Sequence, residues 1–389
     1  MKEEYPSSLP IAQHMDLRKT VSPYVIQLPS KVLDRAREAV HQLYHLSRSA
    51  KFRQAIATKD SELLTHPTKN NSVLMAYDFH SGETKDSLIE VNTNAAMYLI
   101  TDVIHRCHGD TYRLTPPSLD QLKQSFVEEY RLFYGGNGEP RKIVITDEKI
   151  EEQNRYIEFL MYKDLFTKWK WEPEIVSFEK LKIDKDRQAL LTPGGEKIDF
   201  LYNRYCDFYL NRPESIHLRQ AFMQGWCLFS PNPYEYLVLA DKYRMIELGS
   251  QSFQQGIGSD SADWDAINQF VLPTREARSY ENPDSLWAER KRLFFKPKNQ
   301  YGGKSVYRGE RISRTVFQRA LDEDFLVQEF APAPEPKFRQ KDVDPKGWKF
   351  DLRFYVYQDK IQNVVARLYK GQVTNFSTDF GGFAAVEFL

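Results

Sequence analysis

The sequence lacks the features that mark secreted, membrane-spanning or nucleic-acid-binding proteins. The opening stretch MKEEYPSSLPIAQH has no apolar core of the kind that a secretory signal needs. No uninterrupted apolar stretch is long enough to span a bilayer. Lysine plus arginine equals aspartate plus glutamate at 54 each, so no overall charge attracts the chain to nucleic acid or anionic lipid. We expect a cytoplasmic protein with neither partner, in which any affinity for phosphate is local.

Cysteine is also scarce. Cys107, Cys206 and Cys227 are far apart, odd in number and form no CxxC motif. This usage favours reduced structural thiols in a cytosolic protein. Hydrophobic residues make up 41% of the chain and aromatic residues 14%, which indicates a folded protein. A length of 389 residues suggests two or three domains.

The first 70 residues are predicted to form a helical extension. A helix is expected from LPSKVLDRAREAVHQLYHLSRSAKFRQAIA, with Ser30 as its cap. Four apolar residues occupy one stripe of this helix: Leu33, Ala36, Val40 and Leu43. His41 and His45 lie one helical turn apart, which is a spacing that metal ligands use. Because the neighbouring sequence supplies no third ligand, a half-exposed helix surface is the preferred interpretation of this pair.

Two apolar runs joined by SGETKD predict a β-hairpin. Asp78 lies on its first strand, and Glu90 and Asn92 lie on its second. Alternate residues of a strand face the same side, so Glu90 and Asn92 are expected to project together. The three side chains form an all-oxygen set, and Mg²⁺ prefers one or two carboxylates together with substrate phosphates. The alternative is an ordinary half-exposed polar face of the hairpin.

The middle of the chain predicts an α/β unit. Residues 98–134 are expected to be mainly helical, and GGNG at 135–138 is a natural linker. Strand–helix–strand alternation follows, through RKIVITDE, the helical EEQNRYIEFLMYKDLFTKW, EPEIVSF and KIDFLYNRYCDF. Such alternation is typical of a largely parallel sheet. Arg204 and Asp207 lie late in this unit and are candidates for substrate contact, with an ordinary surface ion pair as the alternative.

From Leu286 onward the pattern changes and predicts an antiparallel sheet with one helix. Its strands are expected within RLFFKPKNQYGGKSVYRG, FLVQEF and KFDLRFYVYQDKIQNVVARLYKG, and its helix within SRTVFQRAL. Residues 332–347 are rich in proline and lysine and are predicted to form a mobile loop.

A lysine followed by paired glycines suggests a phosphate-binding loop in FFKPKNQYGGKSV. Lys296 ends an apolar strand, and Gly302 and Gly303 follow it. Paired glycines let backbone N–H groups approach an anion closely, and a nearby ammonium group adds a point charge. An ordinary Gly-Gly turn between strands is the alternative.

Two strand arginines and a second glycine pair offer further anion contacts. Arg353 and Arg367 fall on neighbouring predicted strands, and arginine can bind phosphate or carboxylate oxygens through two parallel bonds. Gly381 and Gly382, in NFSTDFGGF, suit another anion-binding loop. A pair of exposed strand arginines is the alternative for the first of these features.

Together these segments resemble the ATP-grasp ligases. WKFDLRFYVYQDKIQNVVARLYKGQVTNFSTDFGG is similar to the Asp-x-Arg strand, the Ala-Arg strand and the Asn…Gly-Gly loop of bacterial glutathione synthetases, with Asn375 as the asparagine. LADKYRMIEL is similar to the segment that supplies a first phosphate-binding lysine, here Lys242. FLVQEFAPAPE is similar to the hinge that takes the adenine and the acidic residue that holds the ribose. The resemblance thereby implies a nucleotide-binding role for four more residues: Gln328, Glu329, Phe330 and Glu335.

The order of these motifs is the distinctive part of the resemblance. In those ligases the Gly-Gly loop is followed by a strand with Asp and a strand with Glu-x-Asn, whereas here the matching hairpin opens the chain. The resemblance implies a circularly permuted ATP-grasp fold of the α/β (α+β) class. The implied domains are the metal-binding hairpin with helices (71–134), a Rossmann-like pre-ATP-grasp substrate domain (135–250) and the nucleotide-binding subdomains (251–389). The helical extension (1–70) falls outside the resemblance. Permutation is physically reasonable because chain termini usually lie close together at the surface.

The resemblance also implies an activity, a nucleotide and a metal. ATP would phosphorylate a carboxylate of a small-molecule or peptide substrate, and an amine would then displace phosphate to form an amide. Mg²⁺ would be held by Asp78, Glu90 and Asn92, and Arg353 and Arg367 would stabilise the transferring phosphoryl group. The alternatives are an ATP-dependent kinase on the same scaffold and a non-catalytic ATP-binding protein.

Overall fold

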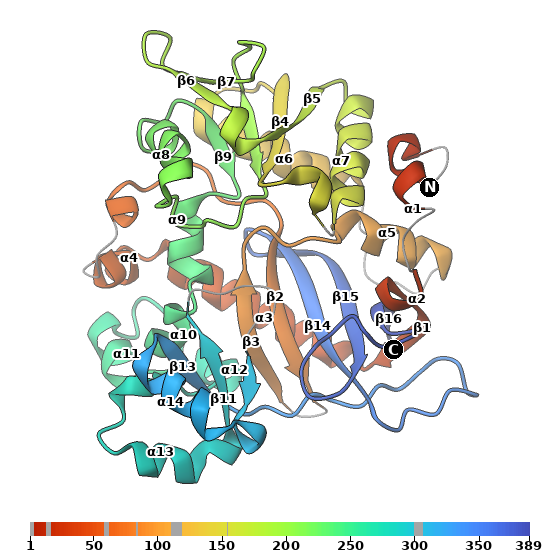
Figure 1. Cartoon of the computed structure of the whole chain (residues 1–389), viewed down its shortest axis with the longest axis vertical. Helices are drawn as coiled ribbons and strands as arrows, with labels where there is room; N and C mark the ends of the chain where they lie inside the picture. The colour runs from red at the N-terminus through yellow and green to blue at the C-terminus, as the bar shows by residue number, and fades with distance from the viewer. Residues whose placement is uncertain are drawn as a thin grey trace.

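A computed structural model of the chain describes residues 4–12, 17–57, 62–82, 85–109, 119–153, 155–298 and 306–389. The described residues form four sheets, of which the three larger ones have helices packed around them (Figure 1). Gly302 and Gly303, and the centre of the SGETKD turn, lie outside the described residues. Within the described ranges, no helix combines the length and the apolar composition needed to cross a membrane.

A six-stranded sheet forms the centre of the molecule, in the order β1-β16-β15-β14-β2-β3. Its strands are β1 (Val21–Leu28), β2 (Met75–Ser81), β3 (Asp86–Asn92), β14 (Trp348–Tyr357), β15 (Lys360–Lys370) and β16 (Gly382–Phe388). The predicted hairpin β2–β3 is present, and β2 pairs antiparallel with β14. Strands from the two ends of the chain therefore share one sheet.

The N-terminal region is not purely helical, contrary to the prediction. It contributes the short helices α1 (Leu9–Ala12) and α2 (Leu17–Thr20), and then β1, which pairs parallel with β16. Residues 332–347 contain no regular strand, as expected for a loop. Part of this loop nevertheless lies beside β1 and forms backbone hydrogen bonds with it. The Gln27 N–H donates to the Lys337 carbonyl, and the Arg339 N–H donates to the Val25 carbonyl. This docking gives β1 hydrogen-bond partners on the side away from β16.

Two helices cover opposite faces of the central sheet. On one face, α3 (Ser30–Arg48) buries the predicted stripe against β14, where Leu352 and Phe354 lie in the same core. On the other face, α5 (Tyr98–Cys107) shares a core with Tyr355 and Val365. Ser30 is the first helical residue rather than a cap, and its hydroxyl donates to the Leu389 carbonyl. The helix ends at Arg48, and α4 (Ala50–Ala57) follows it.

The predicted α/β unit is confirmed as a four-stranded parallel sheet in the order β5-β4-β8-β9. Its strands are β4 (Lys142–Asp147), β5 (Glu172–Ser177), β8 (Phe200–Asn203) and β9 (Leu228–Ser230). Its helices are α6 (Leu119–Tyr134), α7 (Tyr156–Lys168), α8 (Ile216–Met223) and α9 (Pro233–Glu235), and β6 (Lys182–Asp184) pairs with β7 (Ala189–Leu191) beside it. Every residue of β4 is buried, as expected for a strand covered on both faces.

A smaller antiparallel sheet lies below the central sheet in Figure 1, in the order β10-β13-β11-β12. Its strands are β10 (Thr274–Glu276), β11 (Leu293–Pro297), β12 (Tyr307–Arg308) and β13 (Phe325–Glu329). The helices around it are α10 (Tyr243–Leu248), α11 (Gln251–Ile257), α12 (Trp264–Phe270), α13 (Pro283–Glu289) and α14 (Arg314–Asp322). The prediction of one C-terminal antiparallel sheet was wrong, because β14 and β15 join the central sheet instead.

All three cysteines are free thiols, as predicted. Burial raises the pKa of the Cys206 thiol to about 12, and it raises the pKa of the Cys227 thiol as well. A thiol that stays protonated is a poor nucleophile, so these two cysteines fit a structural role.

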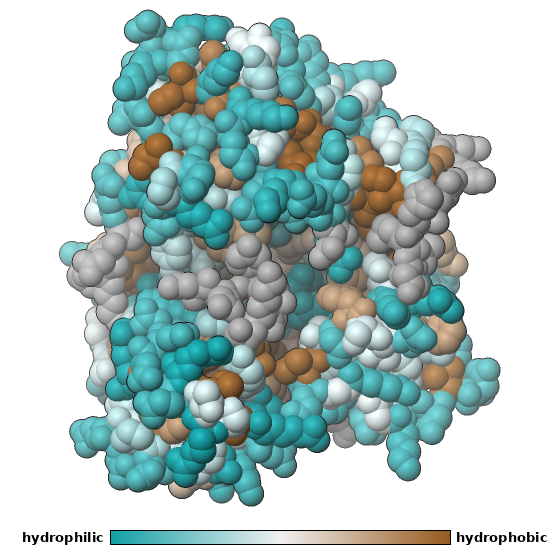
Figure 2. Space-filling model, viewed as in Figure 1, coloured by the Kyte–Doolittle hydropathy of each residue, from teal (hydrophilic) through white to brown (hydrophobic). Residues whose placement is uncertain are grey.

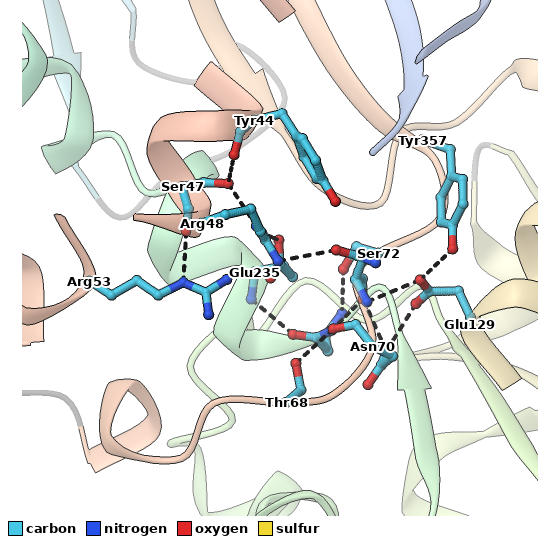
Figure 3. Close-up of polar contacts among 12 residues, drawn as sticks. Tyr44, Ser47, Arg48, Arg53, Thr68, Asn70, Ser72, Glu129, Glu235 and Tyr357 are labelled. Carbon is cyan, nitrogen blue, oxygen red and sulfur yellow. Dashed lines mark hydrogen bonds and ion pairs between the residues drawn. The ribbon is translucent and has the colours of Figure 1, made fainter. Parts of the chain in front are cut away.

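A buried carboxyl, Glu129 of α6, joins the α/β unit to the central sheet (Figure 3). It accepts hydrogen bonds from the Tyr357 hydroxyl (3.0 Å), the Ser230 hydroxyl (2.8 Å), the Asn70 amide (2.9 Å) and the Asn71 backbone N–H (3.0 Å). Burial nevertheless raises its pKa to about 7, since these neutral donors only partly offset the loss of water.

This raised pKa makes stability depend on pH. Glu129 ionises near pH 4.5 in the unfolded chain but near pH 7 in the folded one, so the unfolded state holds fewer protons between these values. We expect the free energy of unfolding to fall by about 3 kcal/mol from this group as pH rises through that window. Urea denaturation of the native chain and of Glu129→Gln at several pH values checks this. The same pH slope in both proteins would contradict the assignment to Glu129.

Candidate active site

A pocket lies where β3 of the central sheet meets the small antiparallel sheet. The segment Leu239–Lys242 forms its third wall. The lining includes four residues that the sequence singled out: Glu90, Lys242, Lys296 and Gln328. Figure 2 shows that the face of the molecule viewed in Figure 1 is mostly hydrophilic and is hollowed near its centre. The structure thus brings together groups that lie up to 238 residues apart in the chain, from Glu90 to Gln328.

The two lysines of this pocket are held by backbone and amide oxygens. Lys296 Nζ donates to Gln328 Oε1 at 2.6 Å and to the Ile89 carbonyl at 3.1 Å. Lys242 Nζ donates to the Pro297 carbonyl at 3.1 Å. Burial lowers the pKa of Lys296 to about 8, against the opposing attraction of Glu90, and burial also lowers the pKa of Lys242. The pocket thus holds two desolvated ammonium groups and two carboxylates, Glu90 and Asp241. The two ammonium groups are the part of this lining that could bind an anion.

Next to this pocket, charged residues cover one face of the central sheet. Asp78 stands opposite Glu90 on β3 and opposite Arg353 on β14. On the next strand pair, Asp351 of β14 stands opposite Arg367 of β15. Because residues two apart on a strand face the same side, all five side chains project from that face.

Asp78 is the centre of this charged face and is fully buried. Its Oδ1 accepts from Arg353 Nε at 2.8 Å, and its Oδ2 accepts from Arg353 Nη2 (2.7 Å), Arg367 Nη2 (2.8 Å) and Asn92 Nδ2 (3.2 Å). Burial raises its pKa, but the attraction of the two guanidinium groups outweighs burial and brings the pKa to about 2. A carboxylate offers about four acceptor positions, so these four bonds occupy its capacity.

This environment differs from the one that was predicted for a metal ligand. A cation on Asp78 would lie beside two guanidinium groups and would have to displace existing hydrogen bonds. Glu90 and Asn92 are only partly buried, and Asn92 Nδ2 donates to Glu90 Oε1 at 3.2 Å. Of the three predicted ligands, these two therefore keep the better access to a cation. Asp78 fits the role of holding the arginines in place.

The glycine pair near the C-terminus is closely packed by other backbone segments, and its part in an anion-binding loop stays a prediction. A Cβ atom on Gly381 would lie 2.7 Å from the Leu368 carbonyl oxygen, and one on Gly382 would lie 2.4 Å from the Thr20 carbonyl oxygen. Gly382 also has a φ of 89°. These positions need glycine because other backbone segments pack against them.

Asn375 organises its own loop. Its Nδ2 donates to the Lys370 and Val373 carbonyls, and its Oδ1 accepts from the Ser377 N–H and hydroxyl. An asparagine whose amide is used in this way forms a local turn. The catalytic role that the resemblance implies for Asn375 stays a prediction.

The predicted adenine hinge is only partly in place. Gln328 is buried in the pocket, whereas Glu329 and Glu335 are exposed. The Glu329 N–H donates to the Pro273 carbonyl, and the Phe330 N–H donates to the Arg292 carbonyl. Two backbone donors of the hinge are thus already used, so contact between this segment and a base stays a prediction.

Arg204 and Asp207 are buried and do not form the surface ion pair that was considered. Arg204 Nη1 donates to the Asn94 carbonyl at 2.9 Å, and its carbonyl accepts from Asn94 Nδ2 at 2.5 Å. Asp207 accepts from the Ser215 hydroxyl at 2.7 Å. Arg204 therefore joins the segment after β3 to the α/β unit. Contact of Arg204 or Asp207 with a substrate stays a prediction.

No family model and no curated protein sequence matches the chain. Among solved structures, the apoform of a glutathione synthetase-like effector from Globodera pallida matches with a TM-score of 0.59 and 12% identity, over 100% of this chain and 96% of that chain. The chain has a glutathione synthetase-like fold. The predicted resemblance and the α/β class are thereby confirmed at the level of the fold, whereas the permutation stays a prediction.

Two further matches are weaker. A protein from Methylobacillus flagellatus KT, provisionally assigned as a gamma-glutamylcysteine synthetase, has a TM-score of 0.49 and 10% identity over 88% of this chain and 86% of that chain. The ATP-grasp ligase PsnB, in complex with precursor peptide PsnA2 and AMPPNP, has a TM-score of 0.30 and 11% identity over 64% and 88%. Scores below 0.5 do not establish a shared fold.

One residue of the charged face and a second pocket had no predicted role. Asp351, the aspartate of the Asp-x-Arg strand, binds Arg367 and Thr374, and its signal was its place two residues before Arg353 on the same strand face. The second pocket lies at the carboxyl ends of β8 and β9. Its lining comprises Thr93, Asn94, Asn203, Tyr205, Phe208, Pro231, Asn232, Pro233 and Tyr236. Ligands of open parallel sheets bind at this end of the strands, but no local motif marked these residues.

Proposed function

We propose that the chain is an ATP- and Mg²⁺-dependent ligase that joins a carboxylate to an amine through an acyl phosphate. One observation carries this proposal. Lys242, Lys296, Glu90 and Gln328 line a single pocket, although the hairpin that holds Glu90 is far in sequence from the other three. The glutathione synthetase-like fold supports the same conclusion, but a fold alone does not decide a function.

The two lysines would bind the phosphate groups of ATP. Both Nζ atoms already lie in the pocket, held by Gln328 and by backbone carbonyls, so little side-chain freedom is lost on binding. Their ammonium groups have been desolvated during folding and would regain strong partners in phosphate oxygens. The base would lie along β13, near Gln328.

Glu90 and Asn92 fit a magnesium site. They offer a carboxylate and an amide on one strand face, beside a pocket suited to phosphate, and this is the donor chemistry that Mg²⁺ prefers. When bound, Mg²⁺ would neutralise phosphate charge and align the phosphoryl group for transfer. The role of Asp78 in this proposal is to position the arginines rather than to bind the metal.

Arg353 and Arg367 would face the transferring phosphoryl group. Each guanidinium has five N–H donors, and two on each bind Asp78 or Asp351, which leaves three among the described residues. Asp78 and Asp351 thus fix the orientation of the two guanidinium planes and leave N–H donors of both arginines available to a phosphoryl group. Donors held in advance of the reaction stabilise developing charge without reorganising, and this is how protein groups accelerate phosphoryl transfer.

In the first proposed step, an oxygen of the substrate carboxylate attacks the terminal phosphorus of ATP, and ADP leaves. In the second step, the amine nitrogen attacks the acyl carbon, the C–O bond to phosphate breaks, and the nitrogen loses a proton. The second pocket would bind the acid or the amine. Tyr236 lines this pocket and lies just before the segment Leu239–Lys242, which lines the first pocket. The products are ADP, phosphate and an amide.

A screen of acids and amines, with ADP release and mass spectrometry as readouts, tests this proposal. Amide formation that needs ATP, an acid and an amine together is the expected result. A phosphorylated hydroxyl product without an amide would identify a kinase instead. ATP binding without ADP release for any substrate pair would favour a non-catalytic protein.

The pKa of Lys296 predicts how ATP affinity depends on pH. With a pKa of about 8, Lys296 is mostly protonated at pH 7 and mostly neutral at pH 9 in the free protein. Because only the ammonium form attracts phosphate, the dissociation constant of ATP should rise by about tenfold between these pH values. Calorimetry at pH 7 and pH 9 measures this change. The same rise in a Lys296→Met variant would show that another group is responsible.

A further inference from the structure

The histidine pair of α3 has a third neighbour that the sequence did not reveal. Asp359 lies in the turn between β14 and β15, and its Oδ2 is 3.7 Å from His41 Nδ1. The His41 and His45 rings have centroids 4.1 Å apart. One ligand atom from each of the three residues lies within 4.8 Å of the others. The absence of a third ligand was the reason to interpret the pair as ordinary helix surface, and the structure removes that reason.

Rigid elements hold all three side chains. His41 and His45 are one turn apart on α3, whose opposite side is anchored in the core by Val40 and Leu43. Asp359 lies in a two-residue turn that is closed by the pairing of Tyr357 with Lys360. Neither the helix nor the turn has to rearrange to bring the ligands together, so side-chain rotation alone can complete a site.

We propose that His41, His45 and Asp359 bind a divalent transition-metal cation of the Zn²⁺ class. Two imidazoles and one carboxylate suit Zn²⁺, whereas Mg²⁺ prefers oxygen ligands. Tetrahedral zinc with bonds near 2.0 Å places its ligand atoms about 3.3 Å apart. The separation of His41 from Asp359 is already close to that value. Half of the His41 side chain and about a third of Asp359 are exposed (51% and 31%), so a cation can enter and a water can take the fourth position.

The cation would link α3 to the β14–β15 turn. The strands that leave this turn carry Arg353 and Arg367, and α3 continues to Tyr44 and Arg48, which belong to the buried polar network of Figure 3. A ligand that binds only the folded chain stabilises it, by an amount that grows with the logarithm of the ratio of free ligand concentration to Kd. The proposed site is thus a stabilising clamp that is separate from the nucleotide pocket.

Calorimetric titration of Zn²⁺ into the full-length chain, without an affinity tag and after treatment with EDTA, tests this proposal. We expect one tight equivalent in the native chain, and binding weaker by about tenfold or more in His41→Asn and in Asp359→Asn. His66→Asn is a matched control, because His66 is an exposed histidine that bonds only within its own segment. Cys107→Ser controls for binding at the exposed thiol.

A melting curve with Zn²⁺ gives a second measure. The native chain and both controls should melt at a higher temperature with the metal than without it, and the His41 and Asp359 variants should not. Equal Zn²⁺ affinity in the native chain and in both of these variants would overturn the proposal. The absence of a tight equivalent in the native chain would also overturn it and would leave an exposed ion pair between His41 and Asp359.

Discussion

An Asp78→Asn variant is expected to be about 3–5 kcal/mol less stable than the native chain. Asp78 is fully buried and joins the guanidinium groups of Arg353 and Arg367. Removing its charge leaves two largely buried cations close together, and Asp351 remains as an ion-pair partner of Arg367. Breaking a buried pair in this way costs more than the pair itself contributes, because the partners stay desolvated. Urea denaturation followed by circular dichroism measures the loss.

Asp86→Asn is the matched control for this experiment. Asp86 lies on the same hairpin and pairs with Arg35, but the Arg35 side chain is 29% exposed and can regain water. Its loss should cost about 1 kcal/mol, as is usual for pairs near the surface. If both variants lose the same stability, then Asp78 is not the centre of the charged face. If Asp78→Asn is fully stable, the burial and pairing described above are contradicted.

A Lys296→Ala variant is expected to lose most of its affinity for ATP. Lys296 Nζ is held by Gln328 and by the Ile89 carbonyl in the pocket, so the proposed phosphate contact is preorganised. Removing one partner of a desolvated charge pair costs about 2 kcal/mol or more, which corresponds to roughly a thirtyfold rise in the dissociation constant. Isothermal titration with ATP and Mg²⁺ measures this change.

Lys291→Ala is the control for the loss of a positive charge. Lys291 is exposed and lies just before β11, so it changes the net charge equally but does not reach the pocket. Its ATP affinity should stay within about twofold of the native value, since exposed charges contribute little. An unchanged affinity in Lys296→Ala, with a folded chain by circular dichroism, would place the nucleotide elsewhere.

The hairpin could be predicted because its signals are local. Two apolar runs around a turn marked both strands, and the alternation of side chains along a strand placed Glu90 and Asn92 on one side. Arg353 and Arg367 were assigned to neighbouring strands for the same reason, and the structure pairs β14 with β15. Where the partners of a residue are a few positions away, the sequence is enough.

The errors arose where the partner is distant in the chain. β1 pairs with β16, more than 350 residues later, and nothing near Val21 indicates that partner. The backbone that approaches Gly382 belongs to Thr20, a contact that the sequence around the glycine pair does not indicate. Asp359 was not linked to His41 for the same reason. Long-range packing also decided the state of Asp78, whose sequence context alone suggested an open metal ligand.

The proposed function depends on one magnesium–nucleotide site that the opening hairpin and the later segments build together. Titration of ATP into the native chain, with and without Mg²⁺, and into Glu90→Gln is the decisive measurement. We expect tight binding that needs Mg²⁺ in the native chain and a large loss of affinity in Glu90→Gln, because this change removes the charge of a metal ligand but keeps the side-chain shape. ATP binding that depends on neither Mg²⁺ nor Glu90 would rule out the shared site.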